Sequence, residues 1–136
     1  MPPDERVKVI RQWSERAEED LRNAEYTLTL MENCPFGTVC FHAEQCVEKY
    51  LKALLVFKGV DFPKTRNIPE LLALVSASVR PALSAEEQEQ LTDYATVTRY
   101  PGDWEPITRE DTERAVEVAR KVREAARKHL PTAVLE

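Results

Sequence analysis

The sequence predicts an all-α fold: an antiparallel, up-and-down four-helix bundle with an additional short helix between the second and third long helices. Apolar residues recur every three or four positions over long stretches, which is the spacing of one helix face. Only three glycines occur in 136 residues, fewer than a sheet-rich domain needs for its turns. The links between the periodic stretches are short, as they are between antiparallel neighbours. We expect a single domain over residues 1–136.

The composition is that of an ordinary globular chain, with 43% hydrophobic residues, 32% charged residues and a net charge of −5. This charge excludes a uniformly basic nucleic-acid-binding surface but leaves room for a local basic patch. Cys34, Cys40 and Cys46 are too few and too far apart for a disulfide framework or structural zinc. Neither a metal nor a cofactor is expected. With no visible signal segment or membrane-length apolar run, a cytoplasmic protein without membrane contact is expected.

The first long helix is expected from about Asp4 to Met31. Its buried stripe steps by three or four residues, through Ile10, Trp13, Ala17, Leu21, Ala24, Leu28 and Met31. Asp20 falls inside this stripe, where an unpaired charge would be costly. Asp20 is therefore either part of a structural ion pair, or a carboxylate in a partly wet groove, or a carboxylate of a functional site.

The central helix is expected from about Thr38 to Lys58, ended by Gly59. One face is apolar and should pack on the rest of the domain: Ala43, Cys46, Val47, Tyr50, Leu54 and Phe57. A second row on roughly the opposite side mixes apolar and polar groups, and should meet a second subunit, a ligand or both: Phe41, Gln45, Glu48, Lys52 and Leu55. Glu48 and Lys52 have the spacing of an ion pair within a helix, and His42 and Lys49 lie near the border between the faces.

Three further helices follow. Asn67 can cap a short helix that has proline in its first turn. Ser84 and Glu87 form a capping box before the third long helix, whose inward residues are Leu91, Tyr94, Ala95 and Thr98. Thr108 caps the last helix, which Pro131 limits. Six cations crowd this last helix, either as a solvated face or in part as a phosphate site: Arg114, Arg120, Lys121, Arg123, Arg127 and Lys128.

The loop from Arg99 to Trp104 concentrates a guanidinium, two aromatic rings and a carboxylate. A guanidinium can bind phosphate and an aromatic face can stack on a base, so the loop is a candidate ligand site. The alternative is that Tyr100 and Trp104 plug the end of the bundle while Arg99 pairs with Asp20.

Four segments together resemble the HEPN domain family, in its small prokaryotic nucleotide-binding form, over about residues 10 to 128. They are residues 17–24, residues 41–54, residues 64–72 and Arg99-Tyr100-Pro101. The resemblance implies a helical bundle that pairs as a homodimer and associates with nucleotides or RNA. It also implies a partner, a separate minimal nucleotidyltransferase, in a toxin–antitoxin-like pair.

Two departures from the family pattern bear on activity. Ribonuclease members carry an arginine followed after four to six residues by histidine, and Arg99 has no such histidine. Arg123 and His129 have the spacing, but they lie late in the last helix and six residues rotate by about 240°. Arg66 also stands where relatives often carry histidine, which replaces a titrating group with a permanent cation.

These observations lead to one main expectation and two alternatives. Two copies would pair through Phe41, Gln45, Glu48 and Leu55, leaving a nucleotide-binding cleft. The cleft would be lined by Asp20, Glu48, Lys49, Lys52, Arg66, Arg99 and Tyr100. The first alternative is a metal-independent ribonuclease toxin, for which the candidate catalytic residues are Arg99, Arg123 and His129. The second is a purely structural partner that masks an apolar face of a nucleotidyltransferase.

Overall fold

A computed structural model describes residues 1–95 and 106–135, and within them helix is the only regular secondary structure. This confirms the all-α prediction. The helices are α1 (Pro3–Leu28), α2 (Phe36–Phe57), α3 (Ile68–Leu74), α4 (Ala85–Ala95), α5 (Arg109–His129) and α6 (Thr132–Leu135). The short helix α6 was not expected, because Pro131 had been assigned only the role of ending α5. Thr98 lies outside the described residues.

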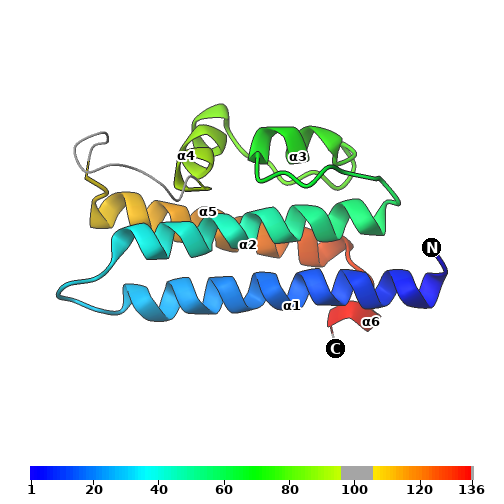
Figure 1. Ribbon diagram of the computed structural model, residues 1–136, viewed down its shortest axis with the longest axis horizontal. Helices are drawn as coiled ribbons and strands as arrows, with labels where there is room; N and C mark the ends of the chain where they lie inside the picture. The colour runs from blue at the N-terminus through cyan, green and yellow to red at the C-terminus, as the bar shows by residue number, and fades with distance from the viewer. Residues whose placement is uncertain (96–105, 136) are drawn as a thin grey trace.

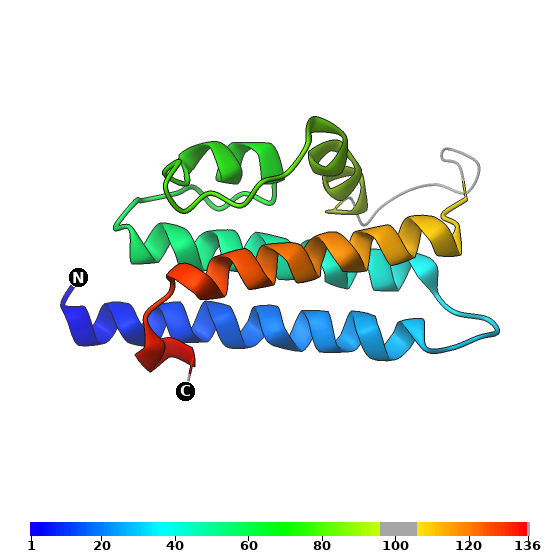
Figure 2. The ribbon, with the colours of Figure 1, turned by 180° about the vertical axis from the view of Figure 1, so that it is seen from behind.

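The three longest helices form the body of the bundle. α2 and α5 run side by side in the same direction, and α1 runs antiparallel to both (Figure 1). α3 and α4 lie over α2 on the side away from α1, and α4 is steeply inclined to the long helices (Figure 2). The terminal helix α6 returns to pack against α1. None of the described helices combines the length and apolar character that a bilayer span requires.

Local signals set the helix boundaries as expected. The Asn67 side chain accepts a hydrogen bond from the Glu70 amide at 2.8 Å and caps α3. Capping boxes open α4 at Ser84 and α5 at Thr108. Gly59 has φ of +68°, the left-handed conformation that suits the residue after a helix end, and the Val60 amide reaches back to the Leu55 carbonyl. These contacts satisfy backbone groups that helix ends leave unpaired.

The core is centred on α2, which packs against α1, α3, α4 and α5. Its predicted apolar face is buried from Ala43 to Leu54, and on α1 the stripe residues Ile10, Ala17, Leu21 and Ala24 are buried against it. The stripe ends sooner than expected. Because α1 stops at Leu28, Met31 lies in the turn and is 86% exposed, so its assignment to the core is wrong.

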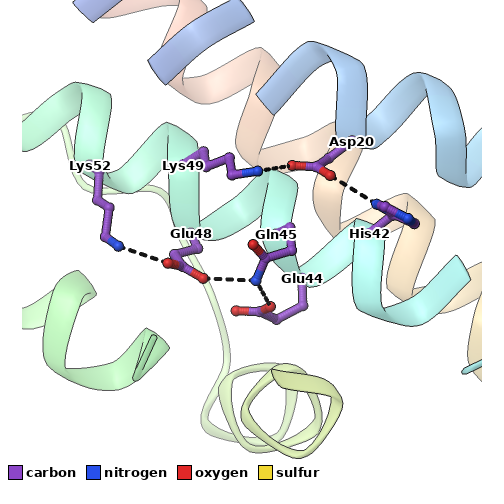
Figure 3. A network of polar contacts seen from close by, with 7 residues as sticks. All are labelled: Asp20, His42, Glu44, Gln45, Glu48, Lys49 and Lys52. Carbon is purple, nitrogen blue, oxygen red and sulfur yellow. Dashed lines mark hydrogen bonds and ion pairs between the residues drawn. The ribbon is translucent and has the colours of Figure 1, made fainter. Parts of the chain in front are cut away.

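The second row of α2 is inside the chain rather than on an outer face. Gln45, Glu48 and Lys52 are each more than nine-tenths buried, and Leu55 is fully buried. The chain's own α3 and α4 pack on this side of α2, as Figure 3 shows around the polar members of the row. The expectation that Gln45, Glu48 and Leu55 await a second subunit is therefore corrected. Phe41 alone remains partly exposed.

Two residues of the expected α1 stripe give a matched test of this packing. Leu21→Ala should lower the free energy of unfolding by about 2–5 kcal/mol, because Leu21 is 4% exposed and its loss leaves a cavity. Met31→Ala should change it by less than about 0.5 kcal/mol, because that side chain is in solvent. Urea unfolding of both variants measures the difference. Equal losses would contradict the end of α1 described above.

Candidate functional site

Asp20 of α1 joins two basic side chains of α2. Its Oδ2 accepts from Lys49 Nζ at 2.5 Å, and its Oδ1 lies 2.8 Å from His42 Nδ1 (Figure 3). The Asp20 side chain is 11% exposed, whereas those of His42 and Lys49 are 24% and 21% exposed. Asp20 thus makes the ion pair that a core-facing carboxylate needs, while both of its partners reach solvent.

A chain of contacts continues from this cluster around α2. The Phe41 ring meets the His42 ring edge to face, with centroids 5.5 Å apart. The Arg66 guanidinium lies 5.9 Å from the Phe41 centroid. Phe41 is half-buried and Arg66 is exposed. We call Lys49, His42, Phe41 and Arg66 the Phe41 strip. It links two cations and two rings through the Asp20 carboxylate and the Phe41 ring, and each of the four side chains is at least partly exposed.

An open groove of about 620 Å³ lies beside Asp20 and Lys49 on the exposed side of α1. Its remaining lining is polar and mixed in charge: Gln12, Glu15, Arg16 and Glu19. The groove gives a ligand access to one end of the Phe41 strip. Because this lining carries both acidic and basic groups, the groove does not select for phosphate. Any selectivity for phosphate therefore has to come from the Phe41 strip.

A second polar cluster lies on the side of α2 that faces α3 and α4. The Gln45 amide donates to Glu44 Oε2 at 2.7 Å and to Glu48 Oε2 at 3.0 Å. Lys52 Nζ donates to Glu48 Oε1 at 2.7 Å, which confirms the ion pair predicted from their spacing. Figure 3 shows the four side chains linked in a row. All these bonds join residues of α2, and because the four side chains are buried they leave little surface for a ligand.

Glu44 is the most unusual member of this second cluster. It is fully buried, and its Oε1 has no hydrogen-bond partner among residues 1–95 and 106–135. Burial raises the pKa of Glu44 to about 8; the Gln45 hydrogen bond opposes the rise and the nearby charge of Glu48 adds to it. A neutral carboxyl group can donate as well as accept, so a proton on Glu44 relieves the repulsion between two adjacent carboxylates. This cluster therefore works as a stabilising network at neutral pH.

The described residues that were expected to line one cleft are divided between these two clusters. Asp20, Lys49 and Arg66 belong to the surface cluster and its strip. Glu48 and Lys52 belong to the buried one, so they are removed from the candidate binding surface. Arg99 and Tyr100 lie outside the described residues.

The alternative ribonuclease pair does not come together. Arg123 Nε donates to Glu18 Oε1 at 2.5 Å, and the Tyr50 hydroxyl donates to the same oxygen. Burial alone would raise the pKa of Glu18, but the hydrogen bonds from Tyr50 and Arg123 lower it below its ordinary value. His129 is exposed at the end of α5. Arg123 thus has a structural role between α1, α2 and α5, and no described contact links it to His129.

Most cations of α5 are paired with carboxylates, which favours a solvated, neutralised helix face over a phosphate site. The ion pairs are Arg114 with Asp111, Arg120 with Glu25 and Glu117, Lys121 with Glu87, and both Arg123 and Arg127 with Glu18.

Two residues of interest were missed as site residues. The sequence places His42 only near the border between the two faces of its helix. Its contact with Asp20 could not be predicted, because the two residues are 22 positions apart on different helices and no spacing rule connects them. Glu44 was not selected, although it lies four residues before Glu48. A run of Glu44, Glu48 and Lys52 at steps of four is a visible signal for a buried polar row once both faces of the helix are known to be covered.

Comparisons with known proteins agree on one family. Residues 10–129 match the HEPN domain family. A Methanocaldococcus jannaschii protein named "Putative toxin MJ1304" is 28% identical over 139 residues, which cover 91% of this chain and 90% of that protein. The crystal structure of TT1696 from Thermus thermophilus is similar with a TM-score of 0.72 and 28% identity, over 89% of this chain and 98% of that one. ST0689, described as an archaeal HEPN homologue, shares the fold with a TM-score of 0.63 and 20% identity, over 88% of this chain and 95% of that one.

Glu44 gives a prediction about stability and pH. Its pKa is higher in the folded chain than in the unfolded one, so the folded state holds an extra proton between about pH 4.5 and about 8. The free energy of unfolding should therefore fall as pH rises through this range. Glu44→Gln, which cannot ionise, should be more stable than the wild type at pH 8, by about 2 kcal/mol, and closer to it at pH 5.

Urea unfolding at several pH values measures this difference. Glu89→Gln on the exposed face of α4 is the matched control, and its stability should track the wild type at every pH. If Glu44→Gln and the wild type show the same pH slope, Glu44 is ionised in the fold and the account of the second cluster is wrong.

Proposed function

Because this chain belongs to the HEPN domain family, we propose that it is a cytoplasmic, toxin-like module that binds RNA or nucleotides. It acts as a homodimer and works with a separate minimal nucleotidyltransferase. The observation that carries the ligand part is the Phe41 strip, in which Arg66 lies against the Phe41 ring, Phe41 contacts His42, and Asp20 holds both His42 and Lys49. The similarity to a protein named as a toxin supports the toxin-like part.

The Phe41 strip has the chemistry of a single-stranded nucleic-acid contact. Aromatic and guanidinium planes stack on bases of any sequence, at about 1–3 kcal/mol for each base. The exposed Arg66 guanidinium offers a flat face together with a fork of N–H donors that matches a phosphate. Lys49 adds a point charge, held by the same carboxylate that contacts His42. A short strand or a single nucleotide could therefore engage one base and one or two phosphates.

The rest of the chain limits this binding to a small area. The net charge is −5, and the cations of α5 are paired with carboxylates. Lys49 itself shares Asp20 with His42, which reduces its attraction for phosphate. We therefore expect modest affinity with a shallow dependence on salt, corresponding to about two phosphate contacts. A long basic channel would show a steeper dependence.

We propose a different surface for contacts with a second copy of the chain and with the nucleotidyltransferase. The row of Gln45, Glu48 and Leu55 is filled by the chain's own helices. At the end of α1 and in the turn that follows it, however, Tyr26, Leu30 and Met31 are exposed at 79%, 48% and 86%. An apolar group of this kind at one end of a bundle is a common place for a protein contact. These three residues could contact a second copy of the chain or the nucleotidyltransferase, and the second contact alone would suffice for a purely structural partner.

Binding of a fluorescent single-stranded RNA tests the ligand part. Arg66→Ala and Lys49→Ala should each weaken binding about tenfold at low salt, because each removes one phosphate or stacking contact. Arg114→Ala is the matched control: its side chain is 56% exposed and pairs with Asp111 within α5, outside the Phe41 strip, so the affinity should stay unchanged. Fluorescence anisotropy gives the three affinities. Equal affinity in all variants would remove the Phe41 strip as the binding surface.

The apolar group at the α1–α2 turn predicts a change in assembly. Light scattering after gel filtration should show a dimer for the wild type, alone or in complex with a co-expressed nucleotidyltransferase. Met31→Glu together with Tyr26→Glu should weaken the assembly that uses this surface, without lowering the melting temperature, because both residues are in solvent. Unchanged assembly in the double variant would assign the contact to another face.

A further inference from the structure

We propose that a groove between α1, α5 and α6 binds an aliphatic polyamine, whose ammonium groups contact Ser14 and the carboxylates of Glu15, Glu18 and Glu19. The groove has a volume of about 370 Å³, enough for a small molecule. It lies where α6 packs against α1 beside the end of α5 (Figure 2). No residue of the Phe41 strip lines it, so the inference is independent of the proposed function.

Ser14 gives this groove a buried hydroxyl that the rest of the chain leaves unused. The residue is 4% exposed and lines the groove, and its Oγ has no hydrogen-bond partner within residues 1–95 and 106–135. A buried polar group without a partner costs free energy, and most such groups in native proteins bond to protein or to a bound molecule. A ligand in the groove would supply the missing partner of Ser14.

Glu18 lies one turn after Ser14 on the same face of α1 and also lines the groove. Its contacts with Tyr50, Arg123 and Arg127 all end on Oε1. Although burial opposes it, the hydrogen bonds from Tyr50 and Arg123 hold the pKa of Glu18 below its ordinary value, so the group is ionised at neutral pH. Its Oε2 is the oxygen left to accept a hydrogen bond from a ligand.

Glu15 and Glu19 add two carboxylates at the rim of the groove. Both are exposed, and neither makes an ion pair with another residue that the structure describes. Residues four apart on a helix have Cβ atoms about 5–6 Å apart, a distance that a chain of four methylene groups spans. The groove thus offers one hydroxyl and three carboxylates as acceptors, which suits ammonium groups, because each has three N–H donors and no acceptor.

The other side of the groove explains why the amine should be aliphatic. Val134 and Leu135 of α6 line it, one buried and one half-buried, so methylene groups can pack there. Two arginines also line the groove. Arg127 lies 3.5 Å from Glu18 Oε1 and is partly neutralised, whereas Arg22 is exposed and makes no ion pair in the described part of the chain. Arg22 is therefore the lining residue that most opposes a bound cation.

Titration of the full-length protein with putrescine at fixed ionic strength tests the inference, with nitrogen–proton NMR of the backbone amides as the readout. The amides of Ser14, Val134 and Leu135 should shift and reach saturation. Ser14→Ala should weaken binding about tenfold, because it removes a hydrogen bond to a charged group, and should not lower the melting temperature, because that hydroxyl has no partner in the described fold. Glu19→Gln should weaken binding about two- to fivefold, as expected for an exposed charge.

Glu89→Gln is the matched control for the loss of one negative charge. It lies on the exposed face of α4, on the side of α2 away from α1, and should bind putrescine like the wild type. If putrescine causes no saturable shift at these amides, or if Ser14→Ala and Glu89→Gln both bind like the wild type, the inference is overturned.

Two other ligands separate a polyamine site from its alternatives. γ-Aminobutyrate, in which a carboxylate replaces one ammonium group, should bind more weakly than putrescine, and Arg22→Ala should strengthen putrescine binding. If γ-aminobutyrate binds more tightly, or if Arg22→Ala weakens putrescine binding, the groove takes a zwitterion and the proposal is wrong. Tetramethylammonium has no N–H donor and should cause no saturable shift; equal shifts with both cations would show charge screening only and would also overturn it.

Discussion

The constraint on which this structure depends is that α2 is covered on nearly every side and still carries charged side chains. A buried charge without a partner costs several kcal/mol, so each one must be neutralised inside the fold. Asp20 does this for Lys49 by lying across the α1–α2 contact, and Lys52 does it for Glu48. Glu44 makes no ion pair with a cation of the described residues, and burial raises its pKa to about 8, so it holds a proton at neutral pH. The packing of four helices around α2 thus requires a specific set of polar pairs.

This constraint also determines which polar atoms are left for function. On the side of α3 and α4 the network is closed, because Gln45 joins both glutamates and Lys52 completes the row. On the side of α1 it is open, because Asp20 is shielded while His42 and Lys49 reach the surface. Removing a partner from a buried pair leaves a costly unpaired charge, which keeps the open cluster in one geometry. A stabilising contact therefore also orients the two basic groups that reach the surface.

Much of the fold could be predicted from local sequence signals. The periodicity in α1 and α2, the caps at Asn67, Ser84 and Thr108, and the positive φ at Gly59 all act within a few residues, so they can be read from the sequence. The family resemblance was likewise carried by short segments, and the match over residues 10–129 confirms it. The prediction that Met31 is buried was wrong, because this apolar residue continues the helical spacing past Leu28, where the helix ends.

The site was harder to predict because it depends on which helix covers which face. The mixed row of α2 was expected to meet a second subunit or a ligand, which is wrong, because the sequence does not show that α3 and α4 cover this row. The contact between Asp20 and His42 depends on the register of α1 against α2, for which no spacing rule exists. The ion pair of Glu48 and Lys52, which depends only on spacing within one helix, was predicted correctly.

The measurement that tests the central claim most directly is nitrogen NMR of the His42 ring in the free protein. If Asp20 holds the ring, the long-range nitrogen–proton spectrum of neutral His42 should show a protonated Nδ1 and an unprotonated Nε2, and Asp20→Ala should release this preference while that of His129 stays unchanged. A neutral ring protonated at Nε2, or a pattern that Asp20→Ala leaves unaltered, would contradict the account of how α1 and α2 fix the polar groups between them.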